Sequence, residues 1–260
     1  MLIEAITSYL EGIAPLELQE PYDNAGLLTG SKTWEATGAI LCLDSTEEVI
    51  QEAIAKRCNL VIAHHPIIFS GLKRLTGAHY IERAIICAIK HDIAIYAIHT
   101  NLDNILQDGV NQKIAQRLKL ADLQILAPKE SATIGSGLLG TLPEAMPPSD
   151  FIEFVKNQMH TSCIRHTKIL DKPIGKVAIC GGSGRFLLSD AIAHQADAFV
   201  SADFKYHEFF EANDEIVVLD IGHYESEQFT IALLRDLLTR KFANFAAHNT
   251  EVVTNPINYR

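Results

Sequence analysis

The stretch NLVIAHHP at residues 59–66 joins an apolar run to a pair of histidines, and it sets the pattern from which the fold can be read. Two later stretches share this pattern of an apolar run that ends in histidine and carboxylate side chains, namely IAIYAIHTNLDN (93–104) and EIVVLDIGHYESE (215–227). Each run is typical of a buried strand in a parallel sheet. Because ligand sites in open α/β sheets lie at the carboxyl ends of the strands, we expect the three polar ends to meet at one metal site.

Strand-like and helix-like segments alternate outward from these runs, which predicts an α/β fold. Pro15 ends an amphipathic helix at the start of the chain, and an apolar strand follows at 39–44. Ser45 or Thr46 can then cap a helix that runs to Arg57. Further along, we expect strands at 59–63 and 93–98 and helices near 78–91 and 109–118.

The middle of the chain changes in composition, because ATIGSGLLGTLPEAMPPSD (132–150) is rich in Gly, Ser and Pro. A predicted helix near 149–159 and a strand near 176–180 follow it, so this part has α/β units of its own. Since the third strand at 215–220 lies beyond them, we expect two lobes. The predicted metal-binding α/β lobe comprises 1–125 plus 215–260, and the second α/β lobe, inserted into the first, comprises 126–214.

Composition limits the classes of protein that this chain can represent. Its 260 residues are 48% hydrophobic, which is enough to fill a globular core. The formal net charge of −10 makes nucleic acid an unlikely partner and favours a small molecule. No apolar stretch reaches the roughly 18 residues of a membrane helix, and the first residues do not resemble a signal peptide, so we expect a cytoplasmic protein without a membrane partner. The five cysteines lack a CxxC pair and mostly lie inside apolar runs, which fits reduced core thiols rather than a disulfide framework: Cys42, Cys58, Cys87, Cys163 and Cys180.

His64 and His65 end the first of the three runs. Adjacent side chains on a strand point to opposite faces, but a turn at the strand end can bring both imidazoles to one side. Pro66 favours such a turn because it has no amide donor and restricts the residue before it. The pair can therefore bind metal, or it can simply close a strand with two polar residues.

The other two runs end in carboxylates as well as histidines. Asp103 can cap the turn that follows it, or it can bridge two cations. His223 and Glu227 are four residues apart, and they share one face if a helix begins near Gly222. That face can offer two ligands to one centre, or it can be an ordinary solvated helix face.

Taken together, the three ends supply more donors than one tetrahedral zinc ion needs, and they suit two divalent ions joined by a shared carboxylate or water. The predicted metal ligands are His64, His65, Asp103, His223 and Glu227. Mixed nitrogen and oxygen donors accept zinc, iron, manganese, nickel or cobalt, and the ligand set does not choose among them. His99 is the candidate catalytic residue, because an imidazole beside the metals can move a proton; it can equally orient a ligand.

Two glycine-rich stretches call for a different interpretation. GSGLLG (135–140) spells GxGxxG, but its sequence context lacks a convincing strand before it and a helix after it, so we predict a glycine-interrupted strand or bend and no nicotinamide cofactor. GGSG (181–184) follows a strand and precedes a helical pattern. A plain turn between strand and helix is favoured there over an anion-binding loop.

Six motifs spread over nearly the whole chain resemble those of the Nif3-like family, whose members are also called GTP cyclohydrolase I type 2 homologues. They are PYDNAGLLTG (21–30), AHHPIIF (63–69), IHTNLDN (98–104), ICGGSG (179–184), SADFKYHE (201–208) and DIGHYESE (220–227). The chain is similar to the short form of the family, because no third domain fits between Asp150 and Lys176. Tyr22 stands where Trp is more frequent, and Leu138 stands where many members carry an Arg that can hold a substrate phosphate.

The resemblance implies a two-lobed Nif3-like fold in which the five predicted ligands bind two metal ions and Asp103 or Glu227 is shared between them. It also implies a ring-shaped homohexamer whose sites face an internal cavity. The activity that it suggests is a metal-dependent hydrolase acting on a nucleotide or related small molecule, with ring-opening hydrolysis of GTP as the specific reaction. The alternative is a non-catalytic metal-binding scaffold or regulatory protein.

Overall fold

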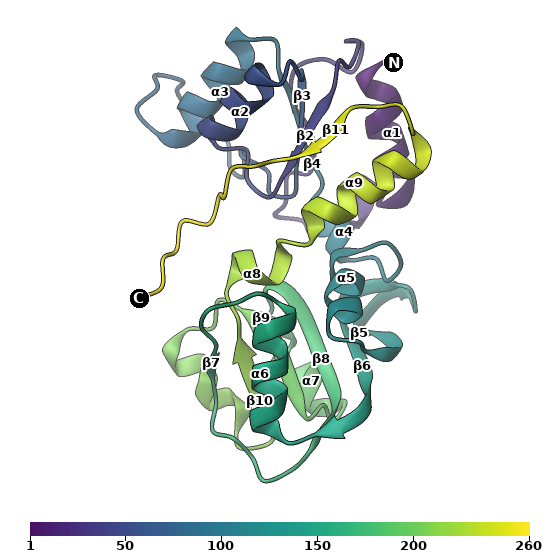
Figure 1. Ribbon diagram of the computed structural model, residues 1–260, viewed down its shortest axis with the longest axis vertical. Helices are drawn as coiled ribbons and strands as arrows, with labels where there is room; N and C mark the ends of the chain where they lie inside the picture. The colour runs from purple at the N-terminus through teal and green to yellow at the C-terminus, as the bar shows by residue number, and fades with distance from the viewer. The chain divides into compact units, whose positions relative to one another are not determined.

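The computed structural model describes the backbone of residues 1–260 and every side chain except that of Glu130. The chain forms two compact units, drawn in Figure 1. Unit 1 comprises Met1–Leu102 and Thr230–Pro256, and unit 2 comprises Asp103–Phe229 and Ile257–Arg260. Each unit is built on its own sheet with helices beside it, which confirms the predicted α/β class and the presence of two lobes.

The sheet of unit 1 is mostly parallel and contains two of the three runs that end in histidine. Its strand order is β1-β4-β3-β2-β11, where β2, β3, β4 and β11 pair in parallel and β1 pairs antiparallel with β4. The strands are β1 (Gly26–Thr29), β2 (Ala39–Cys42), β3 (Leu60–Ala63), β4 (Ala94–Ala97) and β11 (Ala247–Asn249). The three central strands are buried at every position, as expected for a sheet covered on both faces.

Helices cover both faces of this sheet (Figure 1). They are α1 (Ile3–Ile13), the short 3-10 helix η1 (Leu16–Leu18), α2 (Glu47–Ala55), α3 (Tyr80–Lys90) and α9 (Thr230–Lys241). The apolar faces of α2 and α3 pack with β2, β3 and β4 into one hydrophobic core. This packing holds the carboxyl ends of β3 and β4 side by side, in the register Ala63↔Ala97.

The sheet of unit 2 is mixed, in the order β5-β6-β8-β9-β10-β7. An antiparallel part formed by β5, β6 and β8 continues into a parallel part formed by β8, β9 and β10, and β7 pairs antiparallel at the edge. The strands are β5 (Ala121–Ser131), β6 (Ile134–Met146), β7 (Arg165–His166), β8 (Ile174–Ser183), β9 (Ala198–Ala202) and β10 (Val217–Asp220). The stretch GSGLLG lies inside β6, so the prediction of a glycine-interrupted strand is confirmed.

The helical segments of unit 2 are short. They are α5 (Val110–Arg117), α6 (Pro148–Gln158), η2 (Arg185–Leu187), α7 (Leu188–Ala193), η3 (Tyr206–Ala212) and α8 (His223–Glu227), while α4 (Thr100–Asp103) contains the boundary between the units. Side chains from η2, α7 and η3 pack on β8, β9 and β10 to form the core. Helix α8 follows directly on the carboxyl end of β10.

The third run takes a different place from the one expected, because β10 is a strand of the second sheet and not of the first. Residues 103–125 and 215–229, which the sequence analysis placed in the metal-binding lobe, lie in unit 2. The physical reason is strand pairing. Val217–Asp220 pair in parallel with Ala198–Ser201, whereas the position beside β2 in the first sheet is occupied by β11. None of the helices formed by the described residues has the length and apolar character needed to span a membrane.

Asp197 provides a test of how the second sheet is held together. Its carboxylate accepts hydrogen bonds from the amides of Gly175 (2.9 Å) and Lys176 (2.8 Å) and pairs with Lys172. Burial raises the pKa of this carboxyl, but Lys172 and the two amides outweigh burial and hold it below the usual 3.8. Because the folded pKa is depressed, the stabilisation is present above pH 3.8 and is lost as the pH falls below that value.

We therefore expect Asp197→Asn to lower the free energy of unfolding by about 1–2 kcal/mol at pH 7 and by much less near pH 3. Urea denaturation of both proteins at several pH values measures this difference. Asp171→Asn, an exposed aspartate in the loop before β8, serves as the control and should have little effect at either pH. An equal loss for Asp197→Asn at pH 3 and pH 7 would contradict the assignment.

Candidate metal centre

Three histidines gather at the carboxyl edge of the sheet in unit 1. His64 and His65 follow β3, and His99 follows β4 two residues after its end. One ring nitrogen of each histidine lies within 4.8 Å of those of the other two, a spacing that permits all three to coordinate one cation. His64 is fully buried and the other two rings are partly exposed.

Each of these imidazoles is fixed through its Nδ1 atom. Nδ1 of His64 lies 2.8 Å from the carbonyl oxygen of Ile98, and Nδ1 of His65 lies 2.8 Å from Oδ1 of Asp44. A neutral ring that donates from Nδ1 keeps its lone pair on Nε2, which is the atom that then binds a metal. The acceptors therefore select both the tautomer and the direction of the donor atom.

His99 is fixed by Asp23, whose side chain is completely buried. Nδ1 of His99 lies 2.7 Å from Oδ1 of Asp23, and Oδ2 accepts the amide (3.0 Å) and the hydroxyl of Thr100. Burial raises the pKa of the Asp23 carboxyl, but the hydrogen bonds from His99 and Thr100 outweigh burial and lower it to about 2. The neighbouring Asn24 donates its side-chain amide to the carbonyl of Ile68 at 2.6 Å. Asp23 and Asn24, in the stretch PYDN (21–24), thus connect the loop that follows β3 to the loop that follows β4.

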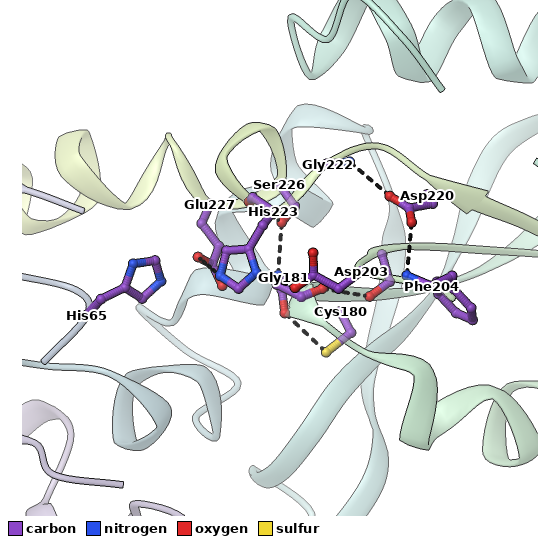
Figure 2. Close-up of polar contacts among 12 residues, drawn as sticks. His65, Cys180, Gly181, Asp203, Phe204, Asp220, Gly222, His223, Ser226 and Glu227 are labelled. Carbon is purple, nitrogen blue, oxygen red and sulfur yellow. Dashed lines mark hydrogen bonds and ion pairs between the residues drawn. The ribbon is translucent and has the colours of Figure 1, made fainter. Parts of the chain in front are cut away.

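Unit 2 presents a second set of donors on α8. Nε2 of His223 lies 3.1 Å from Oε2 of Glu227, so the two residues share one face of the helix as the four-residue spacing predicts (Figure 2). Nδ1 of the same histidine lies 2.7 Å from Oδ2 of Asp203, which adopts a left-handed backbone at φ 62°. Burial lowers the pKa of His223, but the carboxylates of Glu227 and Asp203 on either side outweigh burial and raise it to about 11. This ring therefore lies in a strongly anionic environment.

Asp103 belongs to the same neighbourhood of unit 2. Its carbonyl accepts the side-chain amide of Asn111 at 3.1 Å, and Oδ1 of Asn111 accepts the amide of Gly181 at 2.9 Å. Burial raises the pKa of the Cys180 thiol, and the charges of Asp103 and Glu227 raise it further, so both carboxylates lie near that sulfur. Asn111 and the end of β8 thus connect Asp103 to the region of α8.

The stretch GGSG lies largely within β8, and its second glycine permits a close approach to the donors. Gly182 has φ 62°, and its amide donates to the hydroxyl of Ser226 at 2.8 Å. A Cβ atom at this position would lie 2.4 Å from Oε1 of Glu227 and 3.2 Å from Cε1 of His223. Glycine is required here because α8 packs directly on the strand and leaves no room for a Cβ atom.

The predicted ligands thus fall into two sets, one in each unit. His64, His65 and His99 lie together in unit 1, so the ring of His99, expected as a catalytic group, also lies where it can share a cation with the other two. Sequence reasoning did not identify the three aspartates that fix the rings: Asp23, Asp44 and Asp203. The sequence does contain a pattern that could have identified these aspartates. Asp44 and Asp203 each follow an apolar strand, and Asp23 lies in a motif that carries the family resemblance.

Replacement of Gly182 tests the packing of α8 against β8. We expect Gly182→Ala to displace the side chain of Glu227 and to weaken metal binding by at least about tenfold, because the added methyl group occupies the space of a donor oxygen. Titration of the metal-stripped protein with Zn²⁺ or Co²⁺ measures the affinity. Gly71→Ala, where an added Cβ would meet no atom within 4 Å, is the matched control and should bind as the wild type does. Unchanged affinity in Gly182→Ala would show that Glu227 is not a donor.

Asp203 tests the importance of the Nδ1 acceptors. Asp203→Ala should weaken metal binding by roughly 10–100-fold, because the ring of His223 loses the group that orients it. Asp203→Asn retains an acceptor oxygen and should lose less. Asp214→Ala is a suitable control, since Asp214 has a similar left-handed backbone with φ 53°. Equal losses in Asp203→Ala and Asp214→Ala would mean that backbone strain, and not the acceptor, accounts for the change.

Comparison with known proteins identifies the family of the chain. The model of the DUF34/NIF3 family (NGG1p interacting factor 3) matches residues 1–257. A protein of Clostridium perfringens named "GTP cyclohydrolase 1 type 2 homolog" is 34% identical over 230 residues, which cover 87% of each chain. A protein of the same name from Campylobacter jejuni is 34% identical over 239 residues, which cover 91% of this chain and 92% of the relative. The crystal structure of Staphylococcus aureus hypothetical protein SA1388 superposes with a TM-score of 0.93 at 27% identity, covering 100% of this chain and 99% of that one. A Bacillus cereus protein related to NIF3 shares the fold, with a TM-score of 0.91 at 24% identity and coverage of 100% and 99%. The chain therefore belongs to the DUF34/NIF3 family.

Proposed function

We propose that this chain binds two divalent metal ions and is a metal-dependent hydrolase acting on a nucleotide or a related small molecule. The proposed ligands are His64, His65, Asp103, His223 and Glu227. The observation that carries the proposal is that every histidine of the two donor sets has its Nδ1 atom within 2.8 Å of a fixed acceptor. Histidines that are only polar surface residues have no need of such uniform fixation, whereas metal-binding histidines are regularly held in this way.

The chemistry of the donor set fits the proposed ions. Imidazole nitrogens and carboxylate oxygens suit zinc, iron, manganese, nickel and cobalt, and the set contains no thiolate that would favour a soft ion. The buried thiol nearest to the carboxylates, Cys180, has a raised pKa and is held in its neutral form, so it is a poor ligand. Five or six donors exceed the need of one tetrahedral ion, which supports a pair.

Paired cations in such a centre supply Lewis acidity and lower the pKa of a water molecule, which is the property that hydrolysis needs. The residues of the chain supply the rest. His99, fixed through Nδ1 by a buried carboxylate, is proposed either to complete the donor set or to move a proton at its other nitrogen. Asp103 or Glu227 is proposed as the carboxylate shared between the ions.

The names of the relatives suggest the substrate. Several are named "GTP cyclohydrolase 1 type 2 homolog", and on that ground we propose ring-opening hydrolysis of a purine nucleotide such as GTP as the first reaction to examine. The homohexamer implied by the family resemblance is the assembly that we propose, and native mass spectrometry of the purified protein tests it.

The decisive experiment measures metal content and turnover on the same samples. After reconstitution, we expect about two ions per chain and metal-dependent hydrolysis of at least one member of a nucleotide and phosphoester panel. Asp103→Ala and His223→Ala should each reduce turnover by more than about 100-fold, because even loss of a group that only orients a ligand costs roughly 10–100-fold. His194→Ala, an exposed histidine of the same unit, is the matched control and should retain both metal and activity.

Each outcome separates the alternatives. Fewer than about one ion per chain after reconstitution would contradict the paired centre. Tight binding of two ions without turnover of any substrate would replace the hydrolase with the metal-binding scaffold. Turnover that persists in both variants with intact folding would show that other residues carry the reaction.

A further inference from the structure

Unit 2 contains a cavity that the proposed metal chemistry does not use. It lies between the edge strand β7 and the helix η3, and its volume is about 590 Å³. Pockets of a few hundred to a thousand cubic ångströms are typical of sites for small molecules. The side chains that give it its character are Arg165, His166, Lys168, Tyr206, Phe209 and Phe210.

One wall of the cavity is aromatic. Tyr206 and Phe210 are 72% and 69% exposed, and their ring centroids lie 5.6 Å apart. Phe209 continues this wall toward the core, where its ring lies 5.6 Å from that of Phe204. The exposure of two large neighbouring rings to water is unfavourable in free energy. A planar ligand that packs against them removes this apolar surface from water.

The lining also contains two cationic side chains, Arg165 and Lys168. The guanidinium of Arg165 donates to the carbonyl of Phe204 at 2.8 Å, pairs with the buried carboxylate of Asp220, and lies 5.4 Å from the centroid of the Phe209 ring. It is therefore held in place before any ligand arrives. Lys168 adds a second cation on the rim, and Asp214 is the acidic residue of the lining.

We propose that this cavity binds a small molecule composed of a planar aromatic ring and an anionic group, either a carboxylate or a phosphate. The ring lies against Tyr206, Phe209 and Phe210, and the anion lies between Lys168 and the fixed guanidinium of Arg165. A guanidinium that is already oriented loses little side-chain entropy on binding an anion, and its planar fork matches two oxygens. Aromatic wall and cationic rim together specify both halves of the ligand.

The test is calorimetric titration of the full-length protein with phenyl phosphate and benzoate, and with benzyl alcohol and inorganic phosphate as ligands that carry only one half of the recognised chemistry. We expect saturable binding at one site per chain for the two aromatic anions. Each half-ligand should bind at least about tenfold more weakly, which corresponds to the loss of one favourable contact.

Variants locate the binding. Phe210→Ser and Lys168→Gln should each weaken phenyl phosphate binding by about tenfold. Phe186→Ser and Lys90→Gln are matched controls, because Phe186 is an exposed ring of the same unit outside the cavity and Lys90 is an exposed lysine of unit 1. The His223→Ala variant should bind as the wild type does, which separates this cavity from the metal ligands and leaves the result independent of the proposed hydrolase.

Several results would overturn the proposal. Absence of saturable binding, or equal weakening by Phe186→Ser, would show that the rings do not form a site. Loss of binding in His223→Ala would place the ligand on the metal donors instead. A smaller assembly for Phe210→Ser in sedimentation experiments, with ligand binding unchanged, would mean that a second copy of the chain covers the rings.

Discussion

The hydrogen bond at Nδ1 of each candidate histidine is the interaction on which the rest of the proposed chemistry depends. The carbonyl of Ile98 and the carboxylates of Asp44, Asp23 and Asp203 each hold one ring. A neutral histidine whose Nδ1 proton is engaged keeps its lone pair on Nε2, and its ring is held in the position in which that nitrogen binds a cation. Burial lowers the pKa of His223, but Glu227 and Asp203 raise it to about 11, so this ring must release the proton on Nε2 before that atom can bind a cation. Each proposed metal-binding histidine consequently works as a pair with the residue that accepts the hydrogen bond from its Nδ1 atom, and that residue is as necessary as the imidazole.

The burial of charged side chains in these sets of donors and acceptors costs free energy. We infer from this cost that the arrangement is kept for function. Glu227 is 3% exposed and faces His223 across 3.1 Å, and Asp23 is completely buried. Removing such charges from water costs about as much as their attraction returns, so buried pairs add little to stability. In unit 2, the left-handed backbone of Asp203 adds strain beside His223. A strained position and a buried carboxylate beside one histidine are typical of a binding site rather than of a structural core.

Asp220 connects the two sites that we propose in unit 2. Its carboxylate pairs with Arg165 at the aromatic cavity, accepts the amide of Phe204 at 2.9 Å, and accepts the amide of Gly222 at 3.2 Å, immediately before the donor helix α8 (Figure 2). One buried side chain at the end of β10 therefore orients the cation of the cavity and the first turn of α8. The strand end that precedes the proposed donors His223 and Glu227 therefore also anchors the cavity proposed as a ligand site.

Local elements were predictable from the sequence, because the periodicity that specifies them is contained within a few residues. The helices expected near 78–91 and 109–118 are observed as Tyr80–Lys90 and Val110–Arg117, and the strand expected at 59–63 is observed as Leu60–Ala63. The sequence alone also determined which side chains follow the strands, and hence the candidate donors. Only the tertiary structure decided that Val217–Asp220 joins the second sheet, and that Asp44, Asp23 and Asp203 orient the rings. These acceptors lie 21, 76 and 20 residues from their histidines, and partners at such separations are chosen by the packing of whole sheets, which no local pattern of residues encodes.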